Sequence, residues 1–95
     1  MDIRHLKAFL AVFEERNITA AAQRLCVAQP TLSVTIRHLE EELGVALFLR
    51  QARGVEVSEQ ARQLYPQAQR MVAEAQALSR RFREGQDRLP LQLGV

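Results

Sequence analysis

Hydrophobic positions follow helical spacing over most of this 95-residue chain. Residues 2–16 place their large apolar side chains on one side of a helix, and residues 30–43 repeat an apolar residue at intervals of four, three and four. Gly44 follows the second pattern and is expected to end that helix. The positions that carry the two patterns are Ile3, Leu6, Phe9, Leu10, Val12, Phe13, and then Leu32, Ile36, Leu39 and Leu43.

A short helix is predicted between these two, over residues 19–25. Thr19 is a suitable N-cap for it, and the small alanines that follow let another helix approach closely. Residues 26–29 interrupt the pattern, and Pro30 is tolerated in the first turn of the next helix, where no intrahelical N–H is needed. A short helix, a four-residue break and a longer helix predict a helix-turn-helix, the motif that places its second helix in a DNA major groove.

The outward face of helix 30–43 is polar and basic near its start. At ~100° per residue, the residues opposite the apolar stripe are Pro30, Val34, Arg37 and Glu41, with Thr31, Ser33 and His38 beside it. The acidic run 40–42 opposes the helix dipole and would repel phosphate, so only the N-terminal half is expected to contact DNA. The alternative is an ordinary helical hairpin without a nucleic-acid partner.

Residues 47–57 predict a two-stranded hairpin. Two short apolar stretches flank the turn-like segment 51–54, and Arg50 and Arg53 are expected at its tip. Arginines on a hairpin beside a recognition helix suit the narrow minor groove, where the negative potential is enhanced, so the hairpin is interpreted as the wing of a winged helix-turn-helix. The alternative is that both arginines are ordinary solvated loop charges.

A long helix is predicted after Ser58, which can cap it, over about residues 59–84 or ~39 Å. Pro66 removes one hydrogen bond inside this helix, but it falls opposite the apolar positions, so one continuous helix is expected. Its heptad seam is too long for so small a domain to bury and predicts a partner helix, although packing on its own domain is the alternative. The seam consists of Ala61, Leu64, Ala68, Met71, Ala75, Leu78 and Phe82.

These features together resemble the DNA-binding domain of LysR-type transcriptional regulators, over essentially the whole chain. The pieces that carry the resemblance are Phe9, Ala21-Ala22, Leu25, Gln29-Pro30, Leu32-Ser33, Ile36-Arg37, Leu39-Glu40, Leu43-Gly44, Leu47-Phe48 and Ser58-Glu59. The resemblance implies major-groove contacts at Gln29, Pro30, Thr31, Ser33, Val34 and Arg37, and a minor-groove contact at Arg53. It also implies a homodimer through the linker helix, with tetramers possible in full-length members.

Three positions depart from the family pattern. Ala28 stands where a serine cap is usual, Val34 where a basic or amide side chain is common, and Ala61 where glycine is frequent. Val34 can pack on a thymine methyl group but cannot make a bidentate hydrogen bond, so the family's base preferences do not transfer.

The expected organisation is a winged helix-turn-helix over 1–58, a linker and dimerisation helix over 59–86, and a segment 87–95 that opens a truncated effector-binding domain. The fold is thus mainly α. No cofactor is expected in this chain, and a small-molecule effector is expected to bind the missing domain.

Composition adds little. The formal charge of +2 is weak evidence for a nucleic-acid partner, although Lys7 is the only lysine among 13 basic residues. A single cysteine, Cys26, suits a reducing compartment and is expected to be a buried apolar group, while the lack of a signal peptide or transmembrane run predicts a cytoplasmic protein. Metal-ligand spacing, phosphate loops and nucleophile–base pairs are absent from the sequence. A DNA-binding regulator is therefore favoured over a helical adaptor that only dimerises, and both over an enzyme.

Overall fold

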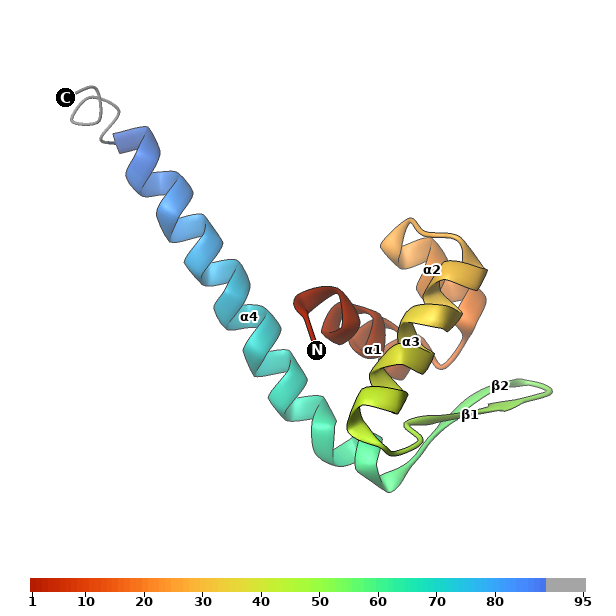
Figure 1. The fold of residues 1–95 in the computed structure, drawn as a ribbon. Coiled ribbons are helices and arrows are strands. Elements are labelled where there is room, and N and C mark those ends of the chain that lie inside the picture. The colour runs from red at the N-terminus through yellow and green to blue at the C-terminus, as the bar shows by residue number, and fades with distance from the viewer. Residues whose placement is uncertain (89–95) are drawn as a thin grey trace.

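The structure is a computed structural model, in which residues 1–88 are described. Within this described part of the chain, four helices and one hairpin follow one another, which confirms the predicted mainly α, winged helix-turn-helix architecture (Figure 1). The elements are α1 (Ile3–Glu15), α2 (Ile18–Leu25), α3 (Gln29–Leu43), β1 (Phe48–Gln51), β2 (Gly54–Val57) and α4 (Glu59–Arg88). The segment 89–95, which holds most of the predicted start of an effector domain, lies outside the described residues.

Helix α1 is the centre of the domain, because it packs on all three other helices. One of its faces meets α2 and α3 through Ala8, Ala11 and Val12, and the other meets α4 and the loop after α3 through Leu6, Phe9 and Leu10. The predicted apolar stripes of α1 and α3 therefore supply the core, as expected. The largest side chains that are fully buried are Phe9, Val12, Leu32, Leu39 and Leu47.

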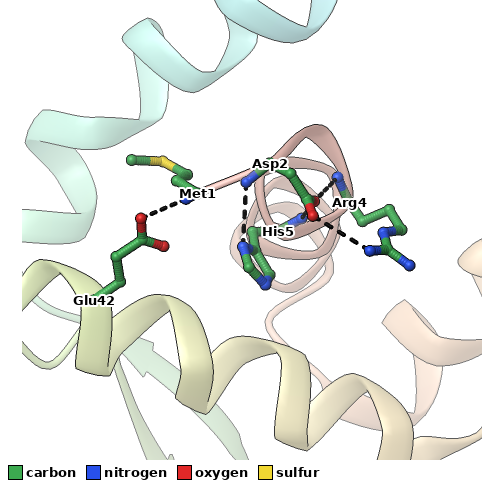
Figure 2. Close-up of polar contacts among 5 residues, drawn as sticks. All are labelled: Met1, Asp2, Arg4, His5 and Glu42. Carbon is green, nitrogen blue, oxygen red and sulfur yellow. Dashed lines mark hydrogen bonds and ion pairs between the residues drawn. The ribbon is translucent and has the colours of Figure 1, made fainter.

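The start of α1 is fixed by local hydrogen bonds and by one contact with α3 (Figure 2). The Asp2 carboxylate accepts from the N–H groups of Arg4 at 2.8 Å and His5 at 3.3 Å, and His5 Nδ1 accepts from the Asp2 N–H at 3.3 Å. This capping box satisfies donors that the first turn leaves free. The Met1 ammonium pairs with the Glu42 carboxylate, so the N-terminus is joined to the C-terminal turn of α3.

The N-cap of α2 is Asn17, and the prediction of Thr19 was wrong. Asn17 has extended backbone angles, φ −156° and ψ 122°, and its Oδ1 accepts from the Ala20 N–H at 2.8 Å. Thr19 lies inside the first turn, so its hydroxyl is not used for capping. At the other end, Cys26 is the C-cap with a φ of 59° and is exposed, which corrects the expectation of a buried thiol.

The recognition helix begins one residue earlier than predicted, at Gln29. Ala28 occupies the N-cap position and makes no side-chain hydrogen bond to the helix, as its departure from the family pattern implied. Gly44 ends the helix with a φ of 73°, and its N–H donates to the Glu40 carbonyl at 2.8 Å. The left-handed conformation at this position explains why a glycine stands there.

The wing is a two-stranded antiparallel hairpin in which Phe48 pairs with Val57 and Gln51 pairs with Gly54. Gly54 has a φ of 137°, and a Cβ at this position would lie 2.8 Å from the Arg16 carbonyl oxygen. The next N–H, of Val55, donates to that same carbonyl at 3.0 Å. Glycine at 54 thus lets the hairpin approach the α1–α2 connection closely enough for this bond.

Helix α4 is continuous through Pro66 and runs to Arg88, two residues beyond the predicted boundary at 86. Its first part packs on α1, with Ala61, Ala68 and Val72 buried. Beyond this contact it projects away from the domain, and the molecule reaches 59 Å in its longest dimension (Figure 1). Ala61 and Ala68 were predicted at a dimer interface; both are fully buried inside their own domain, because their small side chains let α1 approach.

Candidate nucleic-acid interface

The outward face of α3 carries the side chains that the sequence predicted there. Gln29, Pro30, Thr31, Val34 and Arg37 are exposed, and Ser33 is partly buried. Because the opposite stripe is packed into the core, this face is free to meet a partner along its whole N-terminal half. The prediction of which side of the helix faces outward is thus confirmed.

Arg50 lies in strand β1 and not at the tip of the wing, which corrects its predicted place. It pairs with Val55 across the hairpin, and its guanidinium donates a hydrogen bond to Ser33 Oγ on α3. The turn itself is formed by Ala52 and Arg53. The two arginines therefore occupy different positions: Arg50 reaches back to the recognition helix, while Arg53 is exposed at the end of the hairpin.

A concavity of about 400 Å³ lies between the starts of α2 and α3 and the wing. It brings together four of the predicted DNA-binding residues, Gln29, Pro30, Ser33 and Arg50. The other predicted residues lie around it: Arg37 shares a smaller hollow with Ser33 and Arg50, whereas Thr31 and Val34 line a groove toward α1. Arg53 stands apart at the turn. All of the predicted residues except Arg53 thus line hollows that border α3.

Gln29 is held by a residue outside its own helix. Its Nε2 donates a hydrogen bond to the Thr19 Oγ1 of α2, ten positions earlier in the chain. Both residues line the same concavity. The helix-turn-helix break therefore places a threonine hydroxyl directly beside the first side chain of the recognition helix.

The wing is joined to α3 by a carboxylate that the sequence analysis assigned only to an acidic run. Glu40 Oε2 accepts from the N–H groups of Leu47 at 2.7 Å and Phe48 at 3.1 Å. These bonds satisfy backbone donors at the start of β1 and fix the hairpin against the C-terminal turn of α3. Glu40 thus has a structural role in placing the wing, and the third acid of the run, Glu42, is used by the N-terminus.

Ser58 connects the wing to α4. Its Oγ accepts from the Ala61 N–H at 3.1 Å, which confirms the predicted cap, and donates to the Ala46 carbonyl at 2.7 Å. Its backbone N–H donates to the Leu47 carbonyl at 2.9 Å. The same residue therefore follows the hairpin directly and caps the linker helix.

A polar network joins α4 to α1 and α2. The Tyr65 hydroxyl donates to the Glu14 carboxylate, which also pairs with Arg24 at 2.7 Å, and Gln69 donates to the Tyr65 oxygen at 3.0 Å. The Tyr65 hydrogen bond and the Arg24 charge hold the pKa of Glu14 below its ordinary value, and the bond to Glu14 raises the pKa of Tyr65. The Tyr65 ring also stacks on Phe13, with centroids 4.1 Å apart.

Four of the predicted seam residues are exposed on the outer part of α4, and Leu64 is partly buried against the core. Relative exposure is 48% for Met71, 49% for Leu78 and 69% for Phe82. We call Met71, Ala75, Leu78 and Phe82 the outer seam. Large apolar side chains exposed at heptad spacing along one helix are typical of a surface that another helix covers.

Within residues 1–88, the structure contains neither a helix long and apolar enough to cross a membrane nor a cluster of metal-binding side chains.

Sequence comparison places the chain among regulators. Residues 3–62 match the family described as bacterial regulatory helix-turn-helix proteins, lysR family. The transcriptional regulator BenM of Acinetobacter baylyi is 44% identical over 73 residues, which cover 77% of this chain and 24% of BenM. The regulator BudR of Klebsiella aerogenes is 45% identical over 73 residues, which cover 77% of this chain and 51% of BudR. The chain thus spans between a quarter and a half of the length of these relatives.

Comparison with solved structures leads to the same family as the sequence comparison. The crystal structure of the BenM DNA-binding domain in complex with catB site 1 DNA has a TM-score of 0.82 and 38% identity, covering 88% of this chain and 94% of that one. The DNA complex of the CbnR DNA-binding domain has the same TM-score and identity, covering 90% and 98%. Since the family match spans well over half of the chain and its relatives are regulators and not enzymes, the chain belongs to the LysR family and is a winged helix-turn-helix DNA-binding domain of a transcriptional regulator.

Proposed function

We propose that this domain reads duplex DNA with the N-terminal half of α3 in a major groove and the tip of the wing in the adjacent minor groove. The observation that carries this proposal is the grouping of Gln29, Pro30, Ser33 and Arg50 around one concavity beside the exposed face of α3. Arg53 at the end of the hairpin supplies a cation that can enter a narrow minor groove. Structural neighbours at 38% identity that were crystallised with DNA support the same use of the fold.

The individual roles follow from side-chain chemistry. Gln29, Thr31, Ser33 and Arg37 are proposed to contact base edges or nearby phosphates, because amide, hydroxyl and guanidinium groups match the donors and acceptors of the major groove. Pro30 and Val34 offer apolar contact, which suits a thymine methyl group. Arg50, which donates a hydrogen bond to Ser33 Oγ on α3, is proposed to contact the phosphate backbone between the two grooves.

A homodimer through the outer seam is the second part of the proposal. Met71, Ala75, Leu78 and Phe82 are exposed in the single chain, and a second copy of α4 would cover them. Two recognition helices would then meet successive major grooves, with half-sites separated by ~34–36 Å or a multiple. In the full-length protein we expect a small-molecule effector bound by a further domain and a cytoplasmic location, with tetramers possible beyond the dimer.

The test is duplex binding by the purified chain. Genomic fragments selected at near-physiological salt and sequenced should yield an interrupted palindrome, and the log of affinity should fall steeply with the log of salt, because bound arginines release phosphate counterions. Fragments retained without sequence preference would contradict the proposed reading of bases.

Charge reversal separates this function from a helical adaptor that only dimerises. Arg53→Glu should weaken binding to the selected site at least tenfold, since it places a negative charge against the phosphates of the minor groove. Arg70→Glu is the matched control, because Arg70 is an exposed arginine of α4 and its reversal changes the net charge equally. Equal affinities for the two variants would favour the adaptor.

A further inference from the structure

Thr19 and Gln29 form a contact that the proposed reading of DNA does not yet use. Because Asn17 caps α2, the Thr19 hydroxyl is not needed by its own helix, and it accepts a hydrogen bond from Gln29 Nε2 instead. The two residues belong to different helices, and both line the concavity beside the wing. Both side chains are exposed, so DNA can reach the part of the amide that Thr19 does not occupy.

The hydrogen bond fixes which way the amide faces. A glutamine amide has two N–H donors on the nitrogen and a carbonyl acceptor, and rotation by 180° exchanges the two ends. If Thr19 takes the N–H that is trans to Oε1, the other N–H and Oε1 stay side by side and unoccupied by this contact. That pair of groups matches the N7 acceptor and N6 donor of adenine in the major groove.

We infer that Thr19 is a positioning residue that orients the Gln29 amide, so that Gln29 reads an A·T base pair with both of its remaining groups. This inference rests on the proposed function, because it requires α3 to lie in the major groove. Without the Thr19 hydroxyl the amide is free to rotate, and its reversed form presents an acceptor toward N7. Discrimination at that base pair should therefore fall even though Gln29 itself is unchanged.

The experiment compares wild type with Thr19→Val, Thr19→Ser and Gln29→Ala. Valine keeps the branched shape but lacks the hydroxyl, whereas serine keeps the hydroxyl and serves as the conservative rescue. For the site selected with wild type, affinities are measured for all four base pairs at each half-site position and at several salt concentrations. Thermal unfolding of each variant verifies that the fold is intact. Thr19→Ala is a second variant without the hydroxyl, for use if Thr19→Val does not fold.

The expected result is a loss at one position only. Gln29→Ala should identify an A·T pair whose preference in wild type is roughly 5- to 100-fold. Thr19→Val should reduce that preference by about two- to tenfold, the range of one hydrogen bond, while Thr19→Ser retains it. Preferences at other positions and the salt dependence should stay as in wild type.

Other outcomes overturn the inference. Unchanged discrimination in Thr19→Val, or a Gln29-dependent pair other than A·T, would show that Thr19 does not set the reading. An equal loss on all sequences with an unchanged salt dependence would reassign the hydroxyl to a phosphate contact, because an uncharged group releases no counterions. If the wild-type chain showed no sequence preference, the proposed function would fail and this inference with it. If the wild-type chain prefers one base pair and Thr19→Val keeps that preference in full, only this inference fails.

Discussion

The two halves of α4 carry the same heptad pattern but meet different surroundings. As far as Val72, the inward positions Ala61, Ala68 and Val72 are buried against α1. Beyond it, Leu78 and Phe82 are exposed and α4 stands free of the domain (Figure 1). The residue types alone do not separate the two halves, because each combines alanine with larger apolar side chains: Ala61, Leu64 and Ala68 in the first, and Ala75, Leu78 and Phe82 in the second.

The comparison teaches that a heptad repeat identifies a surface that will be covered but not the molecule that covers it. In this chain the repeat changes its partner along its length, from the domain itself to what we propose is a second copy. Substitutions in the two halves should therefore affect different measurements: the stability of the domain in the first half and its association in the second.

The largest effect is expected at Ala68. Ala68→Glu places a carboxylate in a fully buried position against α1, where it has neither space nor a partner, and should cost about 3–5 kcal/mol of folding free energy. Chemical denaturation of the purified chain measures this loss. Ala73→Glu introduces the same charge at an exposed position of the same helix and should stay within about 0.5 kcal/mol of wild type. A similar stability for both variants would mean that the first half of α4 is not part of the core.

An intermediate effect is expected at Phe82, on association only. Phe82→Glu should leave the unfolding transition unchanged and weaken the proposed dimer by roughly 10- to 100-fold, the contribution of about 1.5–3 kcal/mol from burying a phenylalanine. Sedimentation at several protein concentrations measures the mass, and Ala73→Glu again controls for the added charge. An undiminished dimer would exclude the outer seam as its interface.

The smallest effect is expected at Tyr65, which joins the inner half of α4 to α1 and, through Glu14, to α2. Tyr65→Phe keeps the ring that stacks on Phe13 and removes the hydroxyl with its bonds to Glu14 and Gln69, so about 0.5–1 kcal/mol of stability should be lost in this partly solvated setting. Chemical denaturation against pH is the measurement.

The pH dependence of that network has a definite sign. Because the Tyr65 bond and Arg24 depress the pKa of Glu14, its stabilisation is complete above the ordinary value of 4.5 and is lost as the pH falls through the lowered pKa. Because the bond to Glu14 raises the pKa of Tyr65, that contribution is complete below 10.0 and is lost as the pH rises through the raised pKa. Tyr65→Phe should abolish the loss of stability at alkaline pH and reduce the loss at acid pH. If the alkaline loss is unchanged in this variant, it arises from the titration of another group.

The helical part of the fold could be predicted because its signals are local. The stripe on α3, the glycine at its end and the alanines of α2 each act within one or two turns, so the sequence alone identified the outward face. The choice between Asn17 and Thr19 as the cap could not be made, since both are good capping residues and only the extended backbone at Asn17 decides.

The site was predicted less completely because its supports act between elements. Arg50 was placed at the tip on the assumption of a four-residue turn, and the strand register shows a two-residue turn instead. The contacts of Glu40 with β1 and of Arg16 with Val55 join a side chain or carbonyl to distant backbone groups, for which a single sequence contains no signal. The contact between Thr19 and Gln29 could be predicted only after Asn17 was identified as the cap of α2, because only then is the Thr19 hydroxyl left for another partner.

The close approach at Gly54 limits how this domain can acquire a new binding preference. Any larger residue there would meet the Arg16 carbonyl and also be strained by the positive φ, so the strand position directly after the turn cannot be altered without moving the hairpin away from the end of α1. Ala52 and Arg53, at the turn, face no such restriction. If the tip of the wing enters the minor groove as proposed, Ala52 and Arg53 are therefore better sites than Gly54 for directed evolution of its specificity.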